Sequence, residues 1–333
     1  MGYAVELLVT RGVAVLMASL VTACGVAAPP GETRSTSASS TPVATSDATP
    51  GATVKPTPRT AIIGTFDAGG DGWGMTKARG ALWIQVDPPV DAIVRIDIET
   101  GAATPVVPGG RKAKSGPEGL WVEGGDWLAR VDPTTGKESL RVPMGGHFAL
   151  ADGAVWLANE LGLHRIDPET GLVDNPIAWS DAAPCAQPKD LAVAFDSAWL
   201  ACKEGHVVRI VIATGESTMI PTGSGAHTFA VTEDRVWVTN YQAGSVSRID
   251  PVSNTATTIK GTGSGVGITS GDGYIWAAMP HGISRIDPVT ASIVDTISLG
   301  LGEYYELVWD DGIIWASTRG KRVLKVDISN PSP

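Results

Sequence analysis

Two markers that recur together seven times predict an all-β chain folded as a seven-bladed β-propeller with four-stranded blades. One marker is a Trp in a short apolar run, and successive copies are 38, 35, 43, 38, 39 and 39 residues apart: Trp83, Trp121, Trp156, Trp199, Trp237, Trp276 and Trp315. The other follows nine to twelve residues later as a cation, an aliphatic residue and, in six copies, an Asp, as in Arg95-Ile96-Asp97. A period of about 40 residues holding several short strands is typical of propeller blades.

The fifth repeat shows how the strands of a blade are expected to run. Its β-branched and aromatic residues, separated by Gly, Asp and Asn turns, predict strands at 228–231, 236–239, 245–250 and 257–260. Runs such as Asp132–Gly136 (Asp-Pro-x-Thr-Gly) resemble metal loops, but the residue order favours a hairpin turn, because Asp closes an Asx turn and Gly permits a positive φ. The recurring Trp residues are predicted to pack between neighbouring blades.

The two ends of the repeat region are expected to close the ring. The last repeat supplies three strands and lacks a fourth. The first apolar segment, Thr60 to Phe66, parallels residues 291–297, the predicted fourth strand of blade six. We therefore predict that this N-terminal strand completes blade seven and removes its open edge, so that the propeller occupies residues 60–330.

Residues 1–23 are predicted to be a lipoprotein signal peptide. The apolar run Gly12–Val21 is too short to span a bilayer. Val21-Thr22-Ala23-Cys24 resembles a bacterial lipobox, in which Cys24 becomes the lipidated first residue; an ordinary secretory signal with an incidental Cys is the alternative. Residues 24–59, rich in Ser, Thr and Pro, are predicted to be a disordered tether. The predicted location is the cell membrane, lipid-anchored and extracytoplasmic, and we expect a monomer.

Charge and cysteine content restrict the possible partners. The net charge of −10 argues against nucleic acid, which requires clustered Lys and Arg, and against simple adhesion to anionic lipid. Membrane contact is therefore expected through the lipid anchor. Cys185 precedes the inner strand of blade four and Cys202 ends its second strand, so the two lie at one end of a hairpin. In an exported protein they are predicted to form a disulfide.

Several residues point to known propellers. Val236-Trp237-Val238-Thr239-Asn240, followed by Gly244 to Pro251, resembles a YVTN-type repeat. The recurring Gly-x-x-Trp and Arg-Ile-Asp-Pro pattern is also similar to streptogramin (virginiamycin B) lyases. This resemblance covers about residues 60 to 330. It implies a seven-bladed propeller, and for the lyases a metal held by clustered His and Glu that include a Glu-x-His step. The chain has one such step, Glu204-Gly205-His206.

Candidate ligand-binding residues are those expected on one face, in loops that lead into inner strands or leave second strands. They are Glu118, His147, Asn159, Lys189, His227, Asn240, Tyr241, Tyr304, Tyr305 and Arg319. Two imidazoles, His147 and His227, beside Lys189 would suit an anionic ligand, whereas the same imidazoles with Glu118 would suit a metal. Asn159, Asn240 and Tyr241 are expected as outer contacts of this sector. The side of blade seven with Tyr304, Tyr305 and Arg319 is the alternative location.

These observations favour a non-catalytic function. The chain has neither a Gly-x-Ser-x-Gly nor a His-Glu-x-x-His motif, and no catalytic or metal-binding residue is assigned. We predict a cell-envelope lipoprotein that binds or scaffolds a protein, glycan or small molecule without a cofactor. The alternative is a metal-dependent enzyme, either a carbon–oxygen lyase of the streptogramin lyase type or a hydrolase, which would use a divalent metal on the same face.

Overall fold

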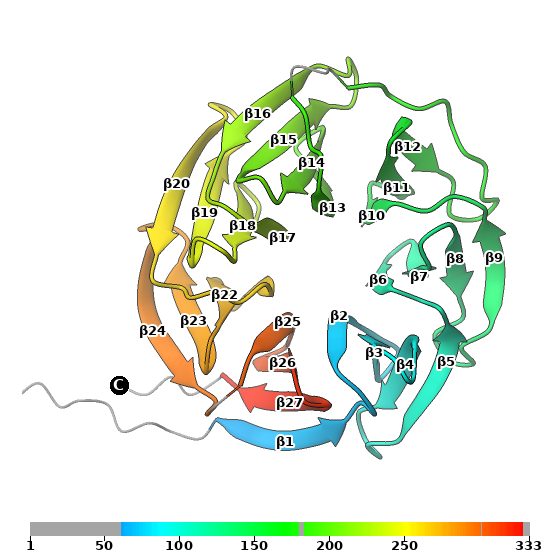
Figure 1. Ribbon diagram of the computed structural model, residues 1–333, viewed down its shortest axis with the longest axis vertical. Coiled ribbons are helices and arrows are strands. Elements are labelled where there is room, and N and C mark those ends of the chain that lie inside the picture. Colours follow the sequence, from blue (N-terminus) through cyan, green and yellow to red (C-terminus); the bar gives the residue numbers. More distant parts are fainter. Residues whose placement is uncertain (1–60, 180–182, 301, 329–333) are drawn as a thin grey trace, which may run out of the picture. The chain divides into compact units, whose positions relative to one another are not determined.

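The computed structural model describes residues 61–179, 183–300 and 302–328, and these form seven antiparallel sheets arranged as a ring (Figure 1). Each sheet is one blade, and one of its two edge strands faces the centre of the ring. The predicted all-β, seven-bladed propeller is therefore confirmed. None of the described segments forms an apolar helix of membrane-spanning length. Cys24, the signal peptide and the tether lie outside the described residues.

The first four blades follow the chain in order. Blade one consists of β2 (Gly72–Ala78), β3 (Ala81–Val86), β4 (Ala92–Asp97) and β5 (Ala103–Pro108). Blade two consists of β6 (Lys112–Gly116), β7 (Gly119–Glu123), β8 (Leu128–Val131) and β9 (Glu138–Val142). Blade three consists of β10 (His147–Ala151), β11 (Ala154–Asn159) and β12 (Gly162–Ile166). Blade four consists of β13 (Pro188–Ala194), β14 (Ser197–Cys202), β15 (His206–Val211) and β16 (Ser217–Pro221).

The last three blades complete the ring. Blade five consists of β17 (Ala226–Val231), β18 (Val236–Asn240), β19 (Ser245–Asp250) and β20 (Thr255–Lys260). Blade six consists of β21 (Ile268–Gly271), β22 (Tyr274–Met279), β23 (Gly282–Asp287) and β24 (Ser292–Ser298). Blade seven consists of β25 (Tyr304–Asp310), β26 (Ile313–Thr318), β27 (Arg322–Asp327) and, from the other end of the described chain, β1 (Ile62–Asp67).

Ring closure occurs as the sequence predicts. β1 pairs antiparallel with β27 and lies along the outer edge of blade seven (Figure 1). Its Phe66 ring packs against Trp315 of that blade, with ring centroids 5.4 Å apart. Beyond β1, the Ala68 N–H donates to Lys321 O and the Gly320 N–H donates to the carboxylate of Asp71. The strand thus covers an edge that would otherwise expose unpaired backbone groups.

The two recurring markers contact each other directly. In every blade the Trp of the second strand is the cross-strand partner of the cation on the third, from Trp83 with Arg95 to Trp315 with Lys325. All seven Trp side chains are buried. Several of the cations also reach the Asp-Pro turn of the next blade: the Arg248 guanidinium, for example, donates to Pro288 O at 2.9 Å. Because the same cation contacts both the Trp of its own blade and the Asp-Pro turn of the next blade, the two markers recur together.

The Asp-Pro loops are turns, as predicted. Asp132 Oδ1 accepts the N–H groups of Thr134 and Thr135, both at 2.8 Å, and these bonds lower the pKa of Asp132 below its usual value. Gly136, which ends this loop, has a φ of +73°, where a side chain would be strained. The carboxylate is therefore occupied by backbone donors within its own turn.

Blade three differs from the others in its outer edge. Its sheet has three strands, and the fourth position is held by two isolated bridges, Leu163 with Ile177 and Ile166 with Val173. The segment that follows leads back to Cys185 and the inner strand of blade four.

Candidate functional site

The seven inner strands all begin at the same face of the ring, which we call the mouth face. A pocket of about 1250 Å³ opens there and spans blades five, six, seven and one. We call it the mouth pocket, and its lining includes Trp73, His227, Tyr241, His281, Tyr304, Tyr305 and Arg319. The structure therefore joins Tyr304, Tyr305 and Arg319 of blade seven with His227 and Tyr241 of blade five. Residues that the sequence assigned to two alternative locations share one pocket.

Aromatic rings form two walls of the mouth pocket. Trp73 of β2 stacks on Tyr305 of β25 with ring centroids 3.9 Å apart, and Trp73 is 36% exposed. The indole N–H of Trp73 donates to Asp87 Oδ2 at 2.6 Å, which fixes the ring. On the opposite wall, His227 and Tyr241 meet edge to face at 5.7 Å. The ring faces in these pairs that are not turned toward their partner suit a ligand that itself contains a ring.

A charged network lies at the rim of blade seven. Glu303 accepts the Tyr305 hydroxyl at 3.0 Å and pairs with the guanidinium of Arg319 at 3.1 Å. The hydrogen bonds from Arg319 and Tyr305 lower the pKa of Glu303. Because Arg319 remains exposed, it can still offer donors to a ligand.

The mouth pocket continues inward through two smaller spaces. A throat of about 320 Å³ shares Trp73, His227 and Tyr305 with the mouth pocket and adds Arg111 and Lys189. Below it, a central cavity of about 370 Å³ is lined from all seven inner strands. The throat and the central cavity share the lining residues Lys112, Thr228 and Glu306, so a continuous path leads from the mouth into the ring.

Two lysines of blade two converge on one aspartate of blade four across this cavity. Lys112 and Lys114 lie two residues apart on β6, so their side chains point the same way. The Asp190 Oδ1 atom accepts from Lys112 Nζ at 2.6 Å and from Lys114 Nζ at 2.9 Å. Asp190 Oδ2 accepts the Phe229 N–H at 3.3 Å. Burial opposes the ionisation of Asp190, but the two ammonium charges outweigh it and lower the pKa of Asp190 far below its usual value.

Glu306 is the second carboxylate at this cavity. It is half-buried on β25. Burial raises the pKa of Glu306 to about 7, against the opposing charges of Lys112 and Lys114. Near neutral pH this carboxyl is therefore about half protonated.

The two predicted histidines border the same region but carry no charge at neutral pH. His147 begins β10 and His227 lies on β17, and Lys189 of β13 is close enough to influence the pKa of each. Burial, followed by the charge of Lys112, lowers the pKa of His147 to about 4 and that of His227 to about 4. The grouping of His147, Lys189 and His227 around one sector agrees with the sequence analysis, but the positive charge there comes from lysines.

Glu118 is a correction to the predicted site. It lies in the hairpin between β6 and β7, at the opposite face from the mouth, and is 6% exposed. Its Oε1 atom accepts the Gly153 N–H of the neighbouring blade at 3.1 Å. Glu118 cannot join His147 and His227 around a metal, because those residues lie at the mouth face.

Three other predicted contacts serve the fold. Asn240 is fully buried and donates to the hydroxyls of Ser245 and Ser247, so its prediction as an outer contact is wrong. Asn159 Oδ1 accepts the Leu161 N–H and also contacts His164 Nε2. Tyr304 is 3% exposed, and its hydroxyl donates to Leu299 O. Asn159 therefore supports its own hairpin, and Tyr304 supports the floor of the mouth pocket.

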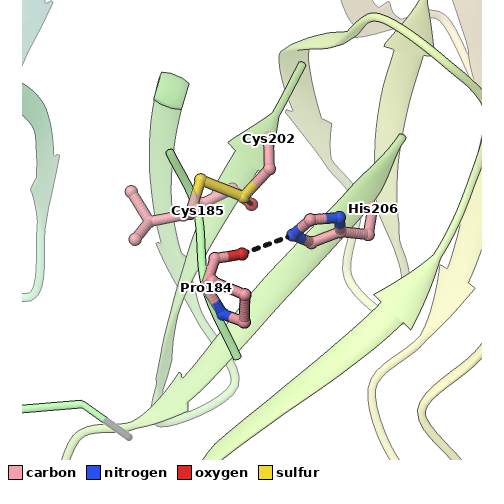
Figure 2. The surroundings of a disulfide bond; sticks show 5 residues. Pro184, Cys185, Cys202 and His206 are labelled. Atoms are coloured by element: carbon pink, nitrogen blue, oxygen red, sulfur yellow. Dashed lines mark hydrogen bonds between the residues drawn. A yellow bond between two sulfur atoms is a disulfide. The ribbon is translucent and has the colours of Figure 1, made fainter. Parts of the chain in front are cut away.

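The structure contains the predicted disulfide between Cys185 and Cys202 (Figure 2). The two Cα atoms are 5.3 Å apart. His206 lies beside the bridge, with its Nε2 atom 2.7 Å from Pro184 O. The disulfide ties the segment before β13 to the end of β14, and β13 carries Lys189 and Asp190.

Sequence reasoning missed the groups with the strongest electrostatic interactions: Lys112, Lys114, Asp190 and Glu306. One signal could have located Lys112. In blades one, four, five and seven the residue at the mouth lies ten positions before the repeated Trp, as Lys189 does before Trp199. The same spacing in blade two gives Arg111, immediately before Lys112, whereas Glu118 is three positions before Trp121. No local pattern in the sequence predicts that Lys114 and Asp190 meet across the ring.

Within the described ranges, neither His147 nor His227 belongs to a group of candidate metal ligands. One group of three is close enough to hold an ion: Cys185, Cys202 and Glu204. Its two sulfur atoms form the disulfide and are not thiolate ligands. The Glu204-Gly205-His206 step therefore lies beside the bridge, where β14 turns into β15.

The fold and the mouth pocket define a seven-bladed propeller with a ligand-sized opening at one face. Virginiamycin B lyase from Staphylococcus aureus has the same fold, with a TM-score of 0.66 at 16% identity over 79% of this chain and 98% of that one. A streptogramin B lyase gives 0.65 at 14% identity over 79% and 94%. BamB from Moraxella catarrhalis gives 0.54 at 15% identity over 77% and 84%. No protein-family model and no curated relative matches the chain. At these identities the likeness establishes the fold alone.

Proposed function

We propose that this protein is a ligand-binding propeller of the cell envelope, which holds a ring-containing small molecule or saccharide in its mouth pocket. The observation that carries the proposal is the aromatic lining of that pocket. Trp73 stacked on Tyr305 and His227 against Tyr241 provide flat surfaces on two sides. A sugar or aromatic ring could pack on these surfaces while Arg319 and Glu303 offer polar contacts at its edge.

The shape of the site favours a small ligand over a protein partner. A volume of about 1250 Å³ is slightly larger than the usual range for small-molecule sites, which suits a ligand of more than one ring. Lipidation at Cys24, followed by the tether to residue 59, would hold this pocket outside the cell and near the membrane.

Binding to a saccharide panel tests the proposal. Calorimetry should find a neutral or acidic saccharide that binds wild-type protein and binds the W73A/Y305A double variant at least tenfold more weakly. Leu161→Ala is the matched control, because Leu161 lies on the same face in blade three, is 65% exposed and is not part of the mouth pocket. Equal affinity in all three proteins would place the ligand elsewhere.

The enzymatic alternative has its own measurement. Elemental analysis of purified protein, with and without the His147→Ala change, should show no stoichiometric divalent metal in either. A bound metal that is lost in the variant would favour the lyase or hydrolase.

A further inference from the structure

The lysine pair inside the ring carries more positive charge than its partner neutralises. Lys112 and Lys114 together contribute two charges, and both pair with the same oxygen of Asp190. Asp190 is 3% exposed, so its own charge is fully committed to this contact. No ion pair within 4 Å joins either lysine to Glu306 in the part of the chain that the structure describes. One positive charge therefore remains on the cluster of Lys112, Lys114 and Asp190 while Glu306, which lines the same cavity, is protonated.

The two ammonium groups also retain unused donors that face open space. Each ammonium has three N–H groups. Lys114 donates to Asp190 and to Leu191 O, and Lys112 donates to Asp190. About a quarter of each lysine side chain is exposed, and both residues line the central cavity. Among the described residues, three ammonium N–H groups thus have no protein acceptor and can reach a molecule in the cavity.

We infer that Lys112 and Lys114 form an anion subsite, and that the ligand of the mouth pocket carries a carboxylate that enters the throat and binds between them. This inference rests on the proposed function, because Lys112 and Glu306 line the passage that joins the central cavity to the throat below the mouth pocket. Trp73 and Tyr305, which stack at the mouth, also line the throat. A ring at the mouth and a carboxylate at the lysines would then belong to one molecule, such as an acidic saccharide.

Charge balance favours a singly charged group. While Glu306 is protonated, one carboxylate added to two ammonium groups and Asp190 gives a neutral cluster, whereas a doubly charged phosphate would leave an unpaired negative charge in a buried space. Burial lowers the pKa of Lys114; Asp190 opposes this shift, and repulsion by Lys112 adds to it. A bound carboxylate would relieve this repulsion. Arg111 and Lys189 line the throat and would attract the anion inward.

The first test compares two probes of matched size, D-glucuronate and neutral D-glucose, by calorimetry. Wild-type protein should bind glucuronate at least tenfold more tightly than glucose. Lys114→Met should remove this preference, because it eliminates the surplus charge and leaves Lys112 paired with Asp190. Lys137→Met is the matched control for the loss of one positive charge, because Lys137 is exposed in blade two and lines neither the throat nor the central cavity; it should change the affinity less than threefold. A glucuronate preference that survives Lys114→Met would overturn the inference.

The second test locates the anion without depending on any sugar. Crystals soaked in sodium bromide should show an anomalous peak within hydrogen-bond distance of the Lys112 and Lys114 Nζ atoms, and none there in Lys114→Met. Bromide at surface cations alone would overturn the anion subsite even if neutral saccharides bind at the mouth. Bromide at the lysine pair with no saccharide bound by any variant would instead reject the proposed function and keep the subsite.

Discussion

Replacing Asp190 by Asn tests the electrostatics of the ring interior. Asn has nearly the same shape, so packing is kept while Lys112 and Lys114 lose the one carboxylate to which they are bonded among the described residues. Removing one partner of a buried ion pair typically costs about 3 to 5 kcal/mol. Because each lysine is about a quarter exposed, water recovers part of this energy, and we expect a loss of about 3 kcal/mol. For a domain of this size that corresponds to a fall in melting temperature of about 6 to 12 °C.

Thermal unfolding followed by circular dichroism measures this effect. Lys114→Met is the control, because it leaves one lysine paired with one aspartate and should cost less than about 1 kcal/mol. The double variant D190N/K114M should lose less stability than D190N alone, since only one unpaired charge then remains. If D190N melted with wild type, the ion cluster would not contribute to stability and the reasoning about surplus charge in the cavity would be refuted.

Four further predictions follow from other parts of the molecule. Cys24→Ala should move the protein from the membrane fraction to the soluble fraction, and identical fractionation of both proteins would contradict the lipobox. Deleting residues 60–66 should expose the edge of β27 and lower the melting temperature strongly; a deletion variant that melts with wild type would show that β1 is dispensable. Changing Cys185 and Cys202 together to Ser should cost about 3 kcal/mol for a loop with a sequence separation of 17, and thiol titration of unreduced, denatured wild type should find neither thiol free. Stability should also depend on pH through groups around the cavity. Because the folded pKa of Glu306 is raised, its contribution to stability falls as pH rises from about 4.5 to about 7, and Glu306→Gln should remove this fall. His147 and His227, whose folded pKa values are lowered, act oppositely, since their contribution to stability is lost as pH falls below about 6.5.

The fold could be predicted because its signals are local and repeated. Each Trp and each Arg-Ile-Asp occupies the same cross-strand position, so seven copies reinforce one interpretation. Ring closure was also predictable, because a missing strand at one end matched a spare strand at the other. The repeat predicts a fourth strand in every blade, but in blade three isolated bridges at Leu163 and Ile166 take the place of that strand.

The candidate site was predictable only in part, because it depends on contacts between blades. Tyr305, Arg319, His227 and Tyr241 were found by their positions in loops, but nothing in the sequence showed that they line one pocket. Glu118 was misplaced because it was assigned to the loop that leads into an inner strand, although it lies in the hairpin that follows one. The lysine pair is invisible to local reasoning, since Lys114 and Asp190 are 76 positions apart and meet across the ring.

The most direct test of the binding function is native mass spectrometry of the protein isolated from cells that produce it. Wild-type protein should retain a small molecule of fixed mass beyond that of its polypeptide and of the lipid proposed at Cys24. The W73A/Y305A variant, which removes the stacked wall of the mouth pocket, should fold and lack that mass, and Leu161→Ala should retain it. The same bound mass in the double variant as in wild type would contradict the assignment of the ligand to the mouth pocket.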